Sequence, residues 1–141
     1  MIRFYSEGAA VPFKGKKQSA KVRIKSLIET ENRKAGNVCF IFCTDDFLLE
    51  INKKHLGHDY YTDVITFDYT VGDIVSGDIF VSVERVSENA ETFGVSFSHE
   101  LSRVMYHGVL HLCGYGDKSP EEEQVMRAKE DFYLETLSTI E

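Results

Sequence analysis

The most regular feature of the sequence is an apolar series that runs from Leu101 to Leu112. Apolar residues or glycine recur there at spacings of three and four, namely Leu101, Val104, Met105, Gly108, Val109 and Leu112. This spacing is typical of an amphipathic helix with one face packed against a core. Ser98 is the expected N-cap, and Gly114 is expected to end the helix in a left-handed conformation. The fold must therefore bury one side of this helix.

Two histidines, His107 and His111, lie four residues apart on the same predicted helix. At about 100° per residue they are about 40° and one turn apart, so their rings can reach one ion. Gly114 turns the chain back and brings Asp117 to the place where a third ligand is needed. Such a pair also occurs on solvated helix faces, but the fixed offsets of Gly114 and Asp117 favour a metal site. Three nitrogen or carboxylate ligands with a fourth position open are the catalytic pattern of zinc. We therefore predict one Zn²⁺, or another divalent ion, per chain at His107, His111 and Asp117.

The remaining elements predict an α+β fold. Short strands are expected at residues 2–5, 37–42, 62–69 and 77–83. Helices are expected at residues 17–33, after Thr44, from Ser82 to Gly94, in the amphipathic series, and after Ser119, where Pro120 and Glu122 complete a start signal. The order βαβαββααα predicts a single domain over residues 1–141, with a small mixed sheet of about four strands packed by about five helices.

Composition excludes several classes of protein. A chain of 141 residues with 43% apolar and 28% charged residues is typical of one folded domain. The longest apolar run, Val38–Phe42, is far too short to span a bilayer, and the N-terminus lacks the pattern of a signal peptide. Three cysteines, an odd number, are expected to be free thiols. We therefore expect a cytoplasmic protein without a membrane partner.

Charge is unevenly distributed along the chain. The net charge of −7 weighs against a nucleic-acid partner, but six cations and no acid lie between Lys14 and Lys25. A second basic cluster, "KKHLGH", runs from Lys53 to His58, and the acids gather after residue 120. Local patches determine which anion binds. The alternative is that residues 17–25 form only the solvated face of a helix.

The residue after the first histidine bears on the chemistry. Zinc proteases with this spacing carry a glutamate there as general base, and this chain has Gly108. Peptide hydrolysis is therefore disfavoured, whereas phosphodiester cleavage can use a metal and nearby cations. The general base cannot be named, and Lys54 and His58 are the candidates for a catalytic role. Glu100 is expected about two turns from His107, in a structural or supporting role, and Asp63 either lines the cleft or caps a turn.

Three segments resemble the YbeY endoribonuclease family. "HELSRVMYHGVLHLCGYGD", from His99, is similar to the family motif H-G-x-L-H-L-x-G-Y-D-H. "TDVITF" from Thr62 resembles T-D-V-L-S-F, and "GDIFVSVERV" from Gly77 resembles a G-D-I strand followed by a helix. The ordered match covers about residues 48–126. The resemblance implies a single-domain, metal-dependent endoribonuclease that acts in rRNA processing, especially at the 3′ end of the small-subunit RNA.

Two positions depart from the family pattern. The family's third ligand is usually histidine, and Asp117 occupies that position here. A carboxylate binds zinc at a similar distance, so the site is expected to survive. The family also tends to carry an arginine at the position of Leu56. Lys54, His55 and His58 are nearby cations, but an ammonium group does not reproduce a planar guanidinium.

Three hypotheses follow. The first is a metal-dependent endoribonuclease of ribosome maturation that binds RNA, from rRNA or the small ribosomal subunit, through Lys53, Lys54 and His58. The second is a metalloprotease-like hydrolase on the same zinc frame. The third is a ribosome- or RNA-binding module with a structural metal. Metal-loaded protein tested on RNA and on a protein substrate distinguishes them.

Overall fold

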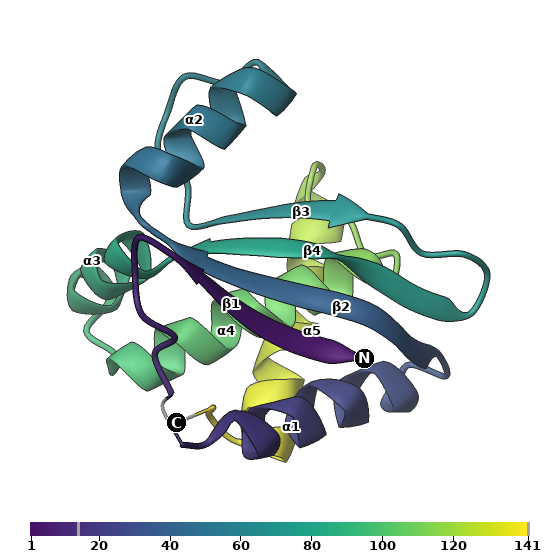
Figure 1. Cartoon of the computed structure of the whole chain (residues 1–141). Helices are drawn as coiled ribbons and strands as arrows, with labels where there is room; N and C mark the ends of the chain where they lie inside the picture. Colours follow the sequence, from purple (N-terminus) through teal and green to yellow (C-terminus); the bar gives the residue numbers. More distant parts are fainter. Residues whose placement is uncertain (14, 141) are drawn as a thin grey trace.

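The fold is a four-stranded mixed sheet with helices on both of its faces (Figure 1). The computed structural model describes residues 1–13 and 15–140, so Lys14 of the basic segment lies outside the described residues. The strands are β1 (Ile2–Glu7), β2 (Lys34–Cys43), β3 (Val64–Asp68) and β4 (Ile74–Ser82). The helices are α1 (Lys17–Thr30), α2 (Asp45–Leu56), α3 (Val83–Phe93), α4 (Phe97–Leu112) and α5 (Pro120–Leu137). The predicted α+β class and the order βαβαββααα are confirmed.

The strand order in the sheet is β1-β2-β4-β3. The β1–β2 and β2–β4 pairs are parallel, and the edge strand β3 runs antiparallel to β4. Helices α1 and α4 cover one face of the sheet, with α5 packed against them, and α2 lies over β3 and β4 on the other face (Figure 1). The start of β3 consequently lies beside α4, where the histidines are.

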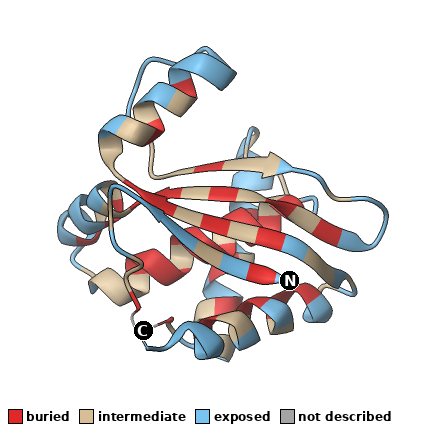
Figure 2. Ribbon diagram, in the orientation of Figure 1, coloured by how far each residue is buried: buried red, intermediate tan, exposed pale blue. Residues whose placement is uncertain are grey.

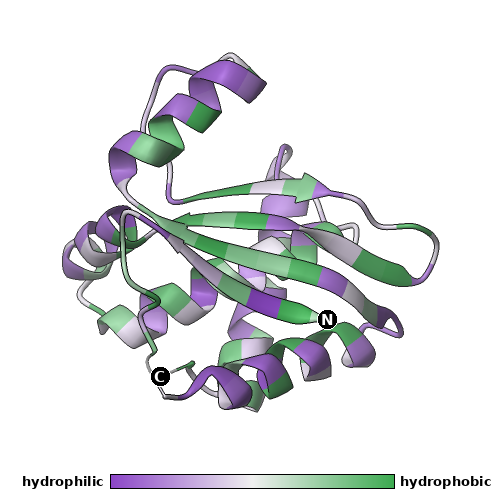
Figure 3. Ribbon diagram, in the orientation of Figure 1, coloured by the Kyte–Doolittle hydropathy of each residue, from purple (hydrophilic) through white to green (hydrophobic). Residues whose placement is uncertain are grey.

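The main core lies between the sheet and α4 (Figure 2). The apolar series predicted from the sequence is buried throughout, and the strands are mostly apolar in Figure 3. Gly108 allows α4 to approach β4 closely, because a Cβ at this position would lie 2.8 Å from Cγ2 of Ile79. Overpacking of this kind costs about 1–3 kcal/mol. Gly108 therefore faces the sheet and sets the depth at which the histidine-bearing helix packs.

Side-chain caps define most helix starts. Thr44, Ser82 and Ser119 cap their helices as expected, and Ser119 forms a full capping box with Glu122. The predicted N-cap of α4 is wrong: Ser96, not Ser98, has extended backbone and accepts the backbone N–H of His99 at 3.1 Å. The helix therefore begins two residues earlier than predicted, at Phe97 instead of His99.

Several predicted boundaries differ from those of the structure by a few residues. The first helix ends at Thr30, β3 begins at Val64, and β4 already begins at Ile74. Gly114 has φ of +104° and turns the chain after α4, as expected. None of the described helices combines the length and apolar character needed to cross a membrane.

Candidate metal centre and its cleft

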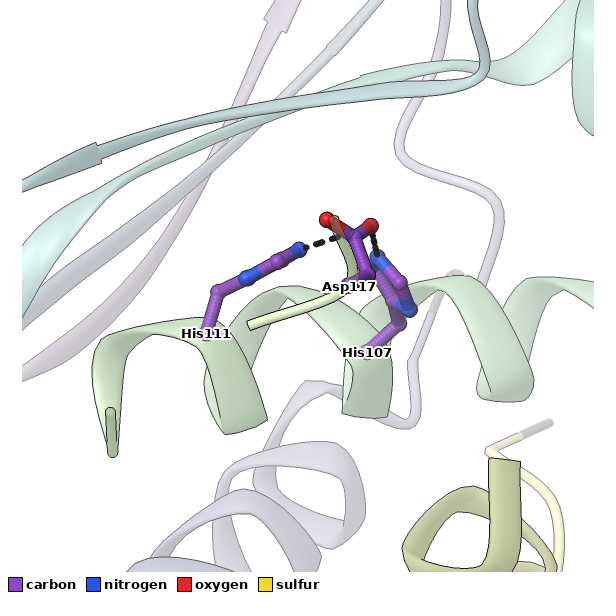
Figure 4. A group of neighbouring side chains, drawn as sticks. All are labelled: His107, His111 and Asp117. Carbon is purple, nitrogen blue, oxygen red and sulfur yellow. Dashed lines mark hydrogen bonds and ion pairs between the residues drawn. The ribbon is translucent and has the colours of Figure 1, made fainter. Parts of the chain in front are cut away.

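Three side chains converge above the C-terminal half of α4 (Figure 4). His107 and His111 come from the helix, and Asp117 comes from the loop before α5. Oδ2 of Asp117 lies 3.4 Å from Nε2 of His107 and 3.3 Å from Nε2 of His111. A tetrahedral zinc ion with bonds of about 2.0–2.1 Å holds its ligands about 3.3–3.4 Å apart. Both distances from the Asp117 oxygen therefore match the spacing around such an ion, and the three candidate ligand atoms all lie within 4.8 Å of one another.

The other ring nitrogen of each histidine is also held. Nδ1 of His111 lies 2.8 Å from the carbonyl oxygen of Tyr115, which can only accept, so this nitrogen carries the proton. Nδ1 of His107 lies 2.6 Å from Oε2 of Glu130. In the neutral rings, both Nε2 lone pairs then face the Asp117 carboxylate. Three electron-rich atoms in contact require a proton or a metal ion between them.

Glu130 is the strongest addition that the structure makes to the site. It projects from α5, is only 4% exposed, and binds His107 with one oxygen. Its other oxygen accepts Nη1 of Arg103 at 2.8 Å, and Nη2 of Arg103 binds Asp131 at 2.6 Å. A carboxylate held in this way fixes the tautomer and orientation of a ligating histidine.

The charges around His107 change its protonation. Burial alone lowers the pKa of His107, but the hydrogen bond that its ring donates to Glu130 and the negative charges of Glu130, Asp117 and Asp63 outweigh burial. The pKa of His107 is therefore raised above its ordinary value of 6.5. Without a metal, the site favours the proton-bound form of this ring.

The turn that carries Asp117 is fixed by a second network. The Tyr115 hydroxyl donates to Glu31 at the end of α1 at 2.6 Å. Lys129 binds the same carboxylate at 3.1 Å, and the Tyr133 hydroxyl also donates to it. Burial raises the pKa of Glu31, but these hydrogen bonds outweigh it and leave the pKa below its ordinary value. The carbonyl that orients His111 therefore belongs to a turn anchored on two helices.

The three candidate ligands lie where two pockets of similar volume meet. The first, here called the acidic lobe, has a volume of about 400 Å³, and its charged lining residues are Asp63, Glu100, Arg103, His107, Asp117, Glu123, Arg127 and Glu130. The second, here called the loop lobe, has a volume of about 390 Å³, and its lining residues outside the first lobe include Asn52, Leu56, His58, Tyr60, Thr62 and Lys118. His107, Asp117, Asp63 and Val64 belong to both.

Burial raises the pKa of two carboxyl groups in the acidic lobe. Asp63, at the start of β3, lines the cleft, and burial raises its pKa despite the opposing charge of His107. Glu100, on α4, is 4% exposed, and burial together with the charge of Asp63 raises its pKa. Glu100 thus lies in the wall of the lobe, consistent with the supporting role expected from the sequence.

Of the three predicted RNA-binding residues, only one lines the cleft. His58 lines the loop lobe, whereas Lys53 and Lys54 line neither lobe. Lys53 lies 3.5 Å from Asp59 and, like Lys54, is in the last turn of α2, where a cation also stabilises the helix dipole. Leu56, at the position where the resemblance implied an arginine, also lines the loop lobe.

Two residues of the loop lobe were not identified from the sequence. Tyr60 and Lys118 are exposed at its mouth, on segments that the sequence did not connect with the histidines. The first basic segment contributes to neither lobe within the described residues, and its Arg23 instead binds the carbonyl oxygen of Leu137 at 2.8 Å. The three cysteines are free, and Cys43 and Cys113 are buried.

Comparison with known proteins identifies the family. Residues 5–138 match the family described as "Endoribonuclease YbeY". A protein of that name from Flavobacterium psychrophilum is 56% identical over 108 residues, which are 77% of each chain. Another, from Parabacteroides distasonis, is 46% identical over 136 residues, covering 96% of this chain and 95% of the relative. The solution structure of TM1509 from Thermotoga maritima is 34% identical, with a TM-score of 0.70 over 97% of this chain and 89% of that chain. The chain belongs to the Endoribonuclease YbeY family.

Proposed function

We propose that this endoribonuclease cleaves single-stranded RNA with one divalent ion, most simply Zn²⁺, held by His107, His111 and Asp117. The observation that carries the proposal is the convergence of three ligand atoms, all within 4.8 Å of one another, where two lobes of a cleft meet. When bound, such an ion supplies Lewis acidity and lowers the pKa of a water molecule.

The side chains around the site have separable roles in this proposal. Glu130 and the Tyr115 carbonyl keep Nδ1 of the two histidines protonated, so that both Nε2 atoms are available as ligands. Asp117 adds a negative charge, where the family usually has a neutral histidine. This charge favours a cation in the site and disfavours a phosphate in direct contact with the carboxylate. RNA therefore needs favourable contacts elsewhere in the cleft.

Gly108 supports cleavage of RNA over cleavage of peptides. The protease glutamate would occupy this position, but Gly108 packs against Ile79 of the sheet and has no room for a side chain. The family membership and the open cleft next to the ligand atoms support an enzyme over a binding module with a structural metal.

The biological substrate follows from the family resemblance. We propose that the chain acts in the cytoplasm on rRNA or the small ribosomal subunit, in maturation of the 3′ end of the small-subunit RNA. We further propose that residues 1–141 act as one domain. The family match over residues 5–138 supports this proposal.

The RNA-binding residues expected from the sequence remain part of the proposal with different support. His58 has the best support, because it lines the same pocket as the ligand atoms. Lys54 and Lys53 lie in the last turn of α2, outside the pocket lining, and would contact phosphates farther along the strand. A catalytic contribution from His58 or Lys54 is also a proposal.

Metal analysis combined with an RNA cleavage assay tests the proposal. The parent should bind about one divalent ion per chain and cleave a single-stranded RNA, but not casein, only when metal is present. His107→Ala and His111→Ala should abolish both stoichiometric metal binding and RNA cleavage. His99→Ala is a suitable control, because His99 lies on the same helix but outside the ligand cluster. A double His107→Ala, His111→Ala variant that still retains one tightly bound ion would contradict the assignment.

A further inference from the structure

Two exposed aromatic rings lie at the mouth of the loop lobe. The rings of His58 and Tyr60 are stacked, with centroids 5.1 Å apart and planes 18° apart, and the Tyr60 hydroxyl is 2.9 Å from Nδ1 of His58. Tyr60 is nevertheless 56% exposed. Because each ring uses one face against the other, the pair leaves an outer aromatic face open to a ligand.

The backbone around these rings is firmly held. The Asn52 side chain is buried and donates to the carbonyl oxygen of Tyr60 at 2.9 Å. The Asn52 carbonyl oxygen accepts the backbone N–H of His58 at 3.1 Å and that of Gly57, whose φ is +68°. A ligand that stacks on a preformed loop avoids part of the entropy cost of ordering it.

The rings share a pocket with the proposed metal ligands. Tyr60 and His58 line the loop lobe together with His107, His111 and Asp117, in a volume of about 390 Å³. This volume is within the range of about 300–1,000 Å³ for pockets that bind small molecules. A nucleotide chain with a phosphate at the metal residues would bring a neighbouring base into this pocket.

The chemistry of the lobe fits an unpaired base. Aromatic rings stack on any nucleobase, because every base has a π face, and proteins that bind single-stranded RNA use such platforms. Leu56, which is 46% exposed, adds an apolar surface beside the rings, and Lys118 provides a cation for a phosphate. The loop lobe thus presents an aromatic and aliphatic surface together with one cation.

We propose that His58 and Tyr60 form a stacking subsite for one unpaired nucleobase beside the phosphodiester that is cleaved. The inference rests on the proposed RNA substrate and adds a binding site to it. The subsite is expected to tolerate different bases, since stacking does not read base edges.

Tyr61 provides a matched control within the same loop. It is 49% exposed, but its hydroxyl donates to Asp46 at 3.1 Å and its ring lies under the guanidinium group of Arg85, 5.4 Å from the ring centroid. Tyr61 lines neither lobe. Tyr60→Ala and Tyr61→Ala therefore remove the same side chain at adjacent exposed positions, and only the first removes a ring from the cleft.

The subsite is tested by measuring how a short, dye-labelled single-stranded RNA binds to the chain after a chelator has removed the metal. Tyr60→Ala should raise Kd about 5- to 150-fold, which corresponds to about 1–3 kcal/mol per stacked base. Tyr60→Phe and Tyr61→Ala should remain within about twofold of the parent, whereas Tyr60→Leu should resemble Tyr60→Ala. Unchanged thermal unfolding and metal affinity in Tyr60→Ala would show that the fold and the metal site are intact.

A scan with RNA that lacks one base at a time identifies the stacked base. At one position, removal of the base should raise the Kd of the parent about as much as Tyr60→Ala raises the Kd for the intact RNA. With the RNA that lacks this base, Tyr60→Ala should cause no further rise in Kd. Equal effects of Tyr60→Ala and Tyr61→Ala, or parent-like binding by Tyr60→Leu, would overturn the subsite while leaving the endoribonuclease proposal intact. A parent that neither binds nor cleaves RNA would instead overturn the proposed function.

Discussion

The acidic lobe and the loop lobe meet at His107 and Asp117, but their other side chains are held very differently. In the acidic lobe, Glu130 is buried between His107 and Arg103, with each carboxylate oxygen in a hydrogen bond. In the loop lobe, Tyr60 and Lys118 are exposed, and the titratable groups other than Tyr60 and the candidate ligands are His58, Lys118 and Asp63, the last shared with the acidic lobe. The buried lobe is suited to orienting a metal ligand, and the exposed lobe is suited to binding a polyanion.

Asp117 is the position where the largest loss of metal binding is expected. Asp117→Ala leaves two ligands one helical turn apart, which cannot fix a tetrahedral ion, so metal affinity should fall to a small fraction of the parent value. Asp117→Asn removes the charge and the strong oxygen donor and should resemble Asp117→Ala. Asp117→His should retain the metal, because both side chains bind zinc at about 2.0–2.2 Å.

Metal titrations on these three variants check the assignment. If Asp117→Ala binds as tightly as the parent, Asp117 is only a loop residue and the third ligand lies elsewhere, for example in the Glu121–Glu123 run at the start of α5.

Glu130→Gln tests whether the acidic lobe orients His107. The amide keeps the size of the side chain but weakens the hydrogen bond to Nδ1 and leaves Arg103 with one fewer buried counter-charge. Loss of such a partner typically lowers metal affinity 10- to 100-fold. Competition with a chelator of known affinity measures the change.

A suitable control for this variant is Glu123→Gln. Glu123 lines the same lobe but has no hydrogen bond to His107. Equal metal affinities of the Glu130→Gln and Glu123→Gln variants would show that the Glu130 contact has no role in orienting the ligand.

Metal binding should depend on pH because of the raised pKa of His107. The ring must lose its ligand-site proton to bind the ion, and the proton-bound form persists above the ordinary value of 6.5. Affinity should therefore increase about tenfold per pH unit up to the raised pKa of His107, and then level off. The metal-free chain should show the opposite trend. The stability from this proton is fully present below 6.5 and is lost as pH rises through the folded pKa.

Thermal unfolding with and without metal between pH 6 and 8 checks both signs. The stabilisation by metal should increase with pH in the parent, and the increase should level off at lower pH in Glu130→Gln, which lacks the charge that raises the pKa of His107. A stabilisation that is constant over this range would exclude His107 as a ligand that competes with protons.

The smallest expected effects are those of single cations on RNA binding. Each phosphate contact contributes a slope of about −0.7 to the dependence of log K on log salt for single strands. Lys118→Gln, at the loop lobe, should flatten the slope by about that amount, and Lys54→Gln should do the same if the strand extends along α2. Lys17→Gln, at the start of α1, should leave it unchanged. A change only in Lys17→Gln would move the RNA surface to the first basic segment.

The features that could be predicted from the sequence are those set by residues close together along the chain. His107 and His111 share one helix, and Asp117 follows after a short turn, so their convergence depends on helical geometry and on Gly114. The capping signals at Thr44, Ser82 and Ser119 are local for the same reason. The order of the elements followed from these signals together with strand alternation.

Features that depend on tertiary contacts could not be derived in this way. Glu130 is 23 residues from His107 in the sequence and was grouped with the other late acids. The available signal was its position between Met126 and Tyr133 on the buried face of α5, where a carboxylate needs a partner. Tyr60 carried no such signal, because exposed tyrosines at 60, 61 and 69 look alike until the pocket is known.

The central claim is that one lobe orients the metal and the other binds RNA, and two titrations on two variants test it most directly. Two affinities are measured for Glu130→Gln and Tyr60→Ala: the affinity for metal, and the affinity of the metal-free protein for single-stranded RNA. Glu130→Gln should lose metal affinity 10- to 100-fold and keep RNA affinity within about twofold. Tyr60→Ala should keep metal affinity and lose RNA affinity about 5- to 150-fold. The division between the two lobes is wrong if both variants lose both affinities. It is also wrong if Glu130→Gln loses only RNA affinity and Tyr60→Ala loses only metal affinity.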